Sequence, residues 1–111
     1  MDLNEYQQTA RKTAIYPAKG ELLGLLYCVL KLNGEAGEVA EKLGKCLRDE
    51  AGKISLERRE ALILELGDVL WYVANLAEEL QMDLEVVAQR NLAKLADRKS
   101  RGTLQGSGDA R

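Results

Sequence analysis

Pro17 is the only proline in this 111-residue chain, and it is the feature that most constrains the fold. Proline interrupts helices, and the residue before it avoids helical geometry, so a first helix must end before Tyr16. The rest of the chain is free of proline and rich in Leu, Ala, Glu, Lys and Arg, which favour helices. No segment alternates apolar and polar residues as a strand does. The sequence therefore predicts an all-α fold.

Four segments carry apolar side chains at helical spacing. The predicted helices cover residues 2–12, 22–47, 55–81 and 84–99. Ser55 and Asp83 are placed to cap the third and fourth helices, and glycines punctuate the chain after residue 100. We expect one α-helical domain over residues 1–99, built as a bundle of four to five helices, and an irregular tail over residues 100–111.

Composition excludes several classes of function. The formal net charge of −2 offers no basic surface for a nucleic acid polymer, and no apolar run reaches the roughly 18 residues of a membrane span. The N-terminus lacks the pattern of a secretory signal, so we expect a cytoplasmic protein. Histidine is absent, which removes histidine-based catalysis and histidine metal ligands. Cys28 and Cys46 lie on one predicted helix roughly 27 Å apart, so we expect buried thiols and no disulfide between them.

The third predicted helix is too apolar for a surface helix. Leu64, Leu70, Trp71 and Ala74 add apolar surface away from its main stripe, as in a helix that is covered nearly all round. We expect Trp71 and Leu64 to pack against a second subunit. The alternative is that the tail and the first helix fold over this face.

Two pairs of carboxylates interrupt the apolar stripes of the long helices. Glu35 and Glu38 lie beside the inward face of the second helix, and Glu65 and Asp68 lie beside that of the third. If the helices pack side by side, the four side chains converge and need cations to offset their repulsion. An oxygen-only, histidine-free site suits a hard divalent ion, above all Mg²⁺.

These acidic residues also admit a purely structural interpretation. Charges at i, i+3 spacing are common on solvated helix faces, and Lys31 and Lys42 could pair with the two glutamates of the second helix. Each acidic pair encloses a glycine, Gly37 or Gly67, which suggests that backbones or a ligand come close there. We expect the other acidic side chains to be solvated: Glu41, Glu57, Glu60, Glu78 and Glu79.

The fourth predicted helix carries polar side chains along its inward edge. Asn91, Lys94 and Arg98 follow one another at helical spacing. An amide, an ammonium and a guanidinium in this order suit the oxygens of a polyanion. The two cations could instead extend past the core to water. Together with the carboxylates, they predict a phosphate-rich ligand joined to the protein through a metal ion.

These motifs resemble a known family. Residues 32–39 and 65–72 hold an ExxE…ExxD signature, and residues 91–98 supply a third block in the expected order. The chain is similar in these blocks to the all-α MazG-like nucleoside triphosphate pyrophosphohydrolases. It departs from the pattern at Gly34, where relatives often carry another glutamate, which leaves open the number of bound metal ions.

The resemblance implies an enzyme that hydrolyses a (deoxy)nucleoside triphosphate to the monophosphate and pyrophosphate, in a housecleaning role. It implies dependence on Mg²⁺, with Mn²⁺ as a substitute, a homodimer or dimer of dimers, and an active site between the two long central helices. By the motif match, Glu35, Glu38, Glu65 and Asp68 are the metal ligands and Tyr72 helps to line the sugar or base pocket.

The mechanism needs a proton acceptor, and without histidine a carboxylate must fill that role; our hypothesis assigns it to Glu38. Lys94, Arg98 and Asn91 would contact the substrate. Two rival functions stay open: a non-catalytic helical module for oligomerisation or interaction, and a phosphoribosyl-ATP pyrophosphohydrolase.

Overall fold

The computed structural model describes residues 1–111, and it is entirely helical. Its elements are α1 (Leu3–Arg11), α2 (Leu22–Asp49), α3 (Leu56–Glu79) and α4 (Leu84–Ser100). The predicted all-α class is confirmed, and each helix begins and ends within about two residues of its expected bounds, the usual spread between methods of assignment. None of these helices combines the length and the apolar character that crossing a bilayer requires.

Side chains at the helix ends explain where the helices begin. The Ser55 hydroxyl accepts a hydrogen bond from the Arg58 amide at 3.1 Å, as its position predicts. Asp83 occupies the corresponding position before α4, but its side chain makes no capping hydrogen bond. Side chains of α1 satisfy those amides instead: the Leu84 amide donates to Gln7 Oε1 at 2.7 Å. The first turn of α4 is therefore fixed by a tertiary contact with α1.

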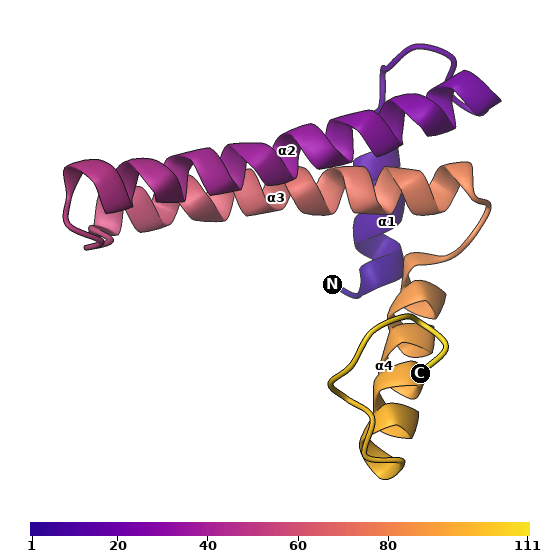
Figure 1. The fold of residues 1–111 in the computed structure, drawn as a ribbon. Coiled ribbons are helices and arrows are strands. Elements are labelled where there is room, and N and C mark those ends of the chain that lie inside the picture. The colour runs from indigo at the N-terminus through magenta and orange to yellow at the C-terminus, as the bar shows by residue number, and fades with distance from the viewer.

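The helices form a long hairpin with two shorter helices at one end (Figure 1). α2 and α3 run antiparallel side by side, and α2 packs on no helix other than α3. α1 crosses α3, while α4 projects away from the end of α3. The molecule measures 43 × 42 × 28 Å along its principal axes, so it is broad and open for a chain of this length.

The buried interior is small. Only 12 of the 111 residues are buried, and the main cluster consists of Ala10, Ala74, Ala77 and Leu84, where α1, α3 and α4 meet. Leu66 on α3 is 60% exposed. It lies in an open apolar groove on α3. A single chain thus leaves much of its apolar surface in water.

Trp71 makes contacts within its own chain. Its indole N–H donates to Thr13 Oγ1 at 2.8 Å, and its ring meets Tyr16 and Tyr72 edge-on, so the segment after α1 covers part of it. Trp71 stays half-buried, and its packing against a second subunit remains a prediction. The tail takes no part in this cover, because it folds back on α4. Leu64 is 72% exposed.

The two cysteines behave as expected. Cys28 and Cys46 both lie on α2, both are fully buried, and both are free thiols. Burial raises the pKa of the Cys28 thiol, which keeps it protonated and unreactive near neutral pH.

Candidate metal centre and cleft

Three of the four carboxylates singled out in the sequence meet between α2 and α3. Glu35 comes from α2, and Glu65 and Asp68 come from successive turns of α3. One carboxylate oxygen from each lies within 4.8 Å of the other two. The antiparallel hairpin places the middle of α2 opposite the middle of α3, so the two motifs are brought together by helix pairing.

The electrostatics of this cluster favour a cation. Two like charges 4.8 Å apart repel by about 3 kcal/mol at an effective dielectric of about 20. Glu35 and Glu65 are half-buried and Asp68 is exposed, so water screens the cluster only in part. Lys42 Nζ lies 3.4 Å from Glu65 Oε1 and offsets some of the negative charge. The sequence allowed Lys42 to pair with Glu38, but the lysine reaches across to α3 instead.

The cluster opens into a cleft of about 340 Å³. Glu35 and Asp68 supply its acidic side, and Thr13, Trp71 and Tyr72 supply the rest. Tyr72 stands one turn beyond Asp68 on α3, where the sequence placed it beside a substrate pocket. Thr13 and Trp71 were not singled out as lining residues, because their meeting depends on the path of the chain between α1 and α2.

Two tyrosines near the acidic cluster have raised pKa values. Burial, followed by the neighbouring Tyr27 and the charge of Glu35, raises the pKa of Tyr72 to about 12. Burial and the negative charge of Asp68 raise the pKa of Tyr6 on α1. Both phenols therefore stay neutral near pH 7 and can donate hydrogen bonds.

Glu38 and the motif glycines lie differently from the other motif residues. Glu38 is exposed, and its carboxylate does not belong to the group of three. A Cβ atom added at Gly37 or Gly67 would meet nothing within 4 Å. These glycines therefore do not serve a close approach of α2 and α3 within one chain.

The polar residues of α4 lie apart from the acidic cleft. Asn91 and Lys94 line a second cavity of about 350 Å³ together with Arg90, Met82 and Val87, and none of these residues lines the first. α4 projects away from the α2–α3 hairpin (Figure 1). Within one chain, the predicted phosphate-binding residues and the predicted metal ligands therefore do not form a single site.

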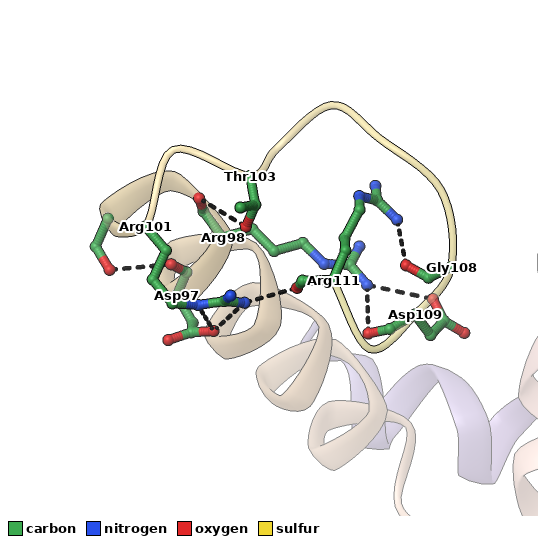
Figure 2. A network of polar contacts seen from close by, with 8 residues as sticks. Asp97, Arg98, Arg101, Thr103, Gly108, Asp109 and Arg111 are labelled. Carbon is green, nitrogen blue, oxygen red and sulfur yellow. Dashed lines mark hydrogen bonds and ion pairs between the residues drawn. The ribbon is translucent and has the colours of Figure 1, made fainter.

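The C-terminal tail covers Arg98. Figure 2 shows the tail looping back over the end of α4, where the Arg98 guanidinium donates to the Asp109 carbonyl at 2.8 Å. The Asp109 carboxylate lies 3.4 Å from Arg98 Nη2 and 3.5 Å from Lys94 Nζ. The hydrogen bond from Arg98, followed by the charge of Lys94, lowers the pKa of Asp109. Arg98 is consequently buried, whereas Asn91 and Lys94 stay exposed.

Glu79 contradicts the expectation of a solvated charge. Its side chain is only 2% exposed. It accepts a hydrogen bond from the Tyr16 hydroxyl at 2.8 Å and lies 3.7 Å from the Arg11 guanidinium. Two consecutive glutamates near the end of a predicted helix gave no sign of this burial, since the partners come from far away in the sequence.

These features define a class: an all-helical protein with a histidine-free acidic cluster beside an aromatic cleft, in the middle of a helical hairpin. The family model of the MazG nucleotide pyrophosphohydrolase domain matches residues 25–102, and the chain belongs to this family. The matched range holds both acidic motifs and the polar block of α4. Family membership implies a nucleotide pyrophosphohydrolase activity.

A relative is found in a bacteriophage. The chain is 53% identical over 114 aligned positions to "Gene 37 protein" of Mycobacterium phage L5, and the match covers the whole of both chains. No solved structure matches the chain.

Proposed function

We propose that the protein is a Mg²⁺-dependent pyrophosphohydrolase that converts a (deoxy)nucleoside triphosphate to the monophosphate and pyrophosphate, with a housecleaning role over nucleotide pools. The observation that carries the proposal is the convergence of Glu35, Glu65 and Asp68 from two helices at the mouth of an aromatic cleft. Family membership supports the class of reaction.

The donor set fits a hard divalent ion. Carboxylate oxygens are the ligands that Mg²⁺ and Mn²⁺ accept, and the three oxygens are close enough to one another to share one ion. Glu35, Glu65 and Asp68 would hold it. When bound, the ion would offset the charge that develops as the bond to the leaving pyrophosphate breaks.

The cleft supplies surfaces for the nucleoside. The faces of Trp71 and Tyr72 can pack against a base or a sugar, and the neutral Tyr72 phenol can donate a hydrogen bond. The Thr13 hydroxyl already donates to the Ala10 carbonyl at 2.8 Å, so it can offer a substrate only an acceptor. Glu38 follows Glu35 by one turn and is exposed to solvent. It would serve as the proton acceptor for the attacking water, without being one of the three clustered ligands.

The contribution of α4 requires a second copy of the chain. Asn91 and Lys94 would bind phosphate oxygens, and Arg98 would join them if the tail that buries it moved aside, yet α4 points away from the acidic cleft of its own chain. The open groove of Ile63, Leu66, Val69, Leu70 and Val73 on α3 offers an apolar surface for that copy. A homodimer or dimer of dimers would cover this groove and could bring α4 of one protomer to the cleft of another.

The decisive experiment is a product analysis. Purified protein is incubated with Mg²⁺ and a panel of ribo- and deoxyribonucleoside triphosphates, and pyrophosphate and monophosphate are measured together. We expect equal amounts of the two products from at least one substrate. Glu65→Gln should abolish the release, whereas Glu41→Gln, an exposed glutamate on α2, should leave it unchanged.

Two other outcomes would replace the proposal. If no nucleotide releases pyrophosphate, with either Mg²⁺ or Mn²⁺, the protein is better explained as a non-catalytic helical module. Turnover restricted to phosphoribosyl-ATP would assign the protein to the related histidine-biosynthesis reaction. Glu38→Gln separates the roles within the site: if it retains near-full activity, Glu38 is not the proton acceptor.

A further inference from the structure

The chain between α1 and α2, residues 12–21, contributes Thr13 to the lining of the cleft, and a buried carboxylate holds this segment in place. We call this segment the α1–α2 loop. The Gly20 amide of the loop donates to both oxygens of Glu79, at 2.9 and 3.0 Å. The Tyr16 hydroxyl donates to the same carboxylate at 2.8 Å. Glu79, at the last residue of α3, therefore fixes the loop at two points.

A cation and an amide complete this network and connect it to the cleft. Arg11 lies 3.7 Å from Glu79 and offsets its charge, and it also donates to the Tyr16 hydroxyl and, at 3.2 Å, to Asn75 Oδ1. Asn75 is buried and donates to the Trp71 carbonyl at 3.1 Å. The network thus runs from Glu79 to the backbone of a residue that lines the cleft.

Aromatic contacts make a second connection. The Tyr16 ring stacks on Tyr27 with centroids 5.6 Å apart, and it meets Trp71 edge-on at 6.3 Å. Trp71 in turn meets Tyr72 edge-on at 4.8 Å and donates to Thr13 at 2.8 Å. Thr13, Trp71 and Tyr72 line the cleft together with Glu35 and Asp68.

Gly24 on α2 shows how closely the loop is seated. A Cβ atom at this position would lie 2.2 Å from the Ala18 carbonyl oxygen and 3.0 Å from Glu79 Oε1. No side chain fits there without moving the loop or the carboxylate. The loop is therefore held in position by its hydrogen bonds to Glu79 and by its close packing on α2.

We infer that Glu79 is a positioning residue for substrate binding: through Tyr16, Gly20 and Arg11 it holds the α1–α2 loop and so fixes the Thr13–Trp71–Tyr72 wall against which the nucleoside packs. The inference rests on the proposed function, because it assigns that wall to the substrate. Glu79 touches no substrate itself. It sets how well the wall is formed before the substrate arrives, and so it governs affinity more than the chemical step.

Glu79→Gln is the sharpest substitution because it keeps the shape of the side chain. An amide offers one acceptor oxygen where the carboxylate offers two, and its NH₂ group would face another donor, either the Gly20 amide or the Tyr16 hydroxyl. It also leaves Arg11 without its counter-charge. Glu78→Gln is the matched control, since the neighbouring carboxylate makes no hydrogen bond or ion pair within this chain.

Trp71 is the only tryptophan, so its fluorescence reports on the wall directly. In Glu79→Gln we expect KM for the best deoxynucleoside triphosphate to rise about tenfold with kcat little changed, as suits the loss of hydrogen bonds to a charged group. We also expect Trp71 emission to shift to longer wavelength and iodide to quench it more strongly, while the far-UV circular dichroism stays helical. Glu78→Gln should change none of these.

Three results would overturn the inference: a fall in kcat with KM unchanged, unaltered Trp71 emission in Glu79→Gln, or the same effects in Glu78→Gln. If Glu79→Gln does not fold, Tyr16→Phe removes one bond to the carboxylate and keeps the ring, and it must shift KM and emission in the same direction. If wild-type protein hydrolyses no triphosphate, the proposed function fails. The inference can then be tested alone by titrating the protein with a deoxynucleoside triphosphate and following the quenching of Trp71 fluorescence. The inference predicts a larger Kd for Glu79→Gln than for the wild type.

Discussion

Two glycines on the same helix should respond differently to the same substitution. Gly24 and Gly44 both lie inside α2. A Cβ atom at Gly44 would meet nothing within 4 Å, whereas at Gly24 it would lie 2.2 Å from the Ala18 oxygen and 2.8 Å from the Ala18 carbonyl carbon. Gly44→Ala should therefore change the free energy of unfolding through helix propensity alone. Gly24→Ala adds a steric clash with the backbone of Ala18.

The expected sizes follow from these distances. Alanine is preferred to glycine in a helix interior by about 1 kcal/mol, so Gly44→Ala should raise the free energy of unfolding by about that amount. Gly24→Ala gains the same term but forces a backbone shift that costs about 1–3 kcal/mol. We expect the two variants to differ by about 1–3 kcal/mol, with Gly24→Ala the less stable.

Urea denaturation followed by Trp71 fluorescence and circular dichroism measures the difference. The wild type and both variants are compared at one protein concentration, because the stability of an oligomer depends on concentration. A Gly24→Ala variant as stable as Gly44→Ala would refute the reasoning, since the α1–α2 loop could not then lie where Ala18 contacts α2.

Further predictions concern a helix cap, a buried phenol and the tail. Ser55→Ala should lower the free energy of unfolding by about 1 kcal/mol in urea titrations, because it leaves the Arg58 amide without its acceptor. The pKa of Tyr72 is raised from 10 to about 12, so the unfolded chain loses this proton first. Its contribution to stability is complete below pH 10 and should decline as pH rises toward 12. Burial also raises the pKa of Tyr6 and Tyr16, so absorbance at 295 nm should show a late-titrating phase that Tyr72→Phe reduces without abolishing it. The pKa of Asp109 is lowered, mainly by Arg98, so the tail contact should hold at neutral pH and weaken as pH falls through that pKa. Asp109→Asn should weaken it at neutral pH, seen as faster hydrogen exchange at the Arg98 guanidinium by NMR; unchanged exchange would contradict the contact.

Local signals in the sequence were enough to predict the helices. Pro17 separates the first two helices, and Ser55 caps the third, because both act through their immediate neighbours. The two acidic motifs could be assigned to facing positions since the hairpin pairing of two long helices follows from their apolar stripes. That reasoning anticipated the meeting of Glu35, Glu65 and Asp68, although it placed Glu38 with them.

The remaining features depend on contacts between distant segments. In the sequence, Glu79 looks like one more surface charge. It is buried because the α1–α2 loop, some 60 positions earlier in the chain, packs against it. The sequence favoured an intermolecular contact for Trp71, because α3 is apolar nearly all round, and it gave no sign of the contacts with Thr13 and Tyr16. The spacing of residues in a helix gives the direction of each side chain around the helix axis. It does not say which other segment of the chain lies in that direction.

The orientation of α4 is another feature that the sequence did not predict. Asn91, Lys94 and Arg98 lie on one helix as their spacing predicts, but the orientation of α4 directs them away from the acidic cleft of the same chain. Arg98 is engaged by Asp109 of the tail. Neither the direction of α4 nor the path of the tail has a local signal in the sequence.

The central claim is that Glu35, Glu65 and Asp68 together bind a divalent cation. The most direct measurement is a titration of the protein with Mn²⁺, followed by the loss of the electron paramagnetic resonance signal of the free ion. The account predicts that wild-type protein and Glu41→Gln bind Mn²⁺ alike and that Asp68→Asn, which loses one of three ligands, binds it at least about tenfold more weakly. Equal affinity in wild type and Asp68→Asn would contradict it.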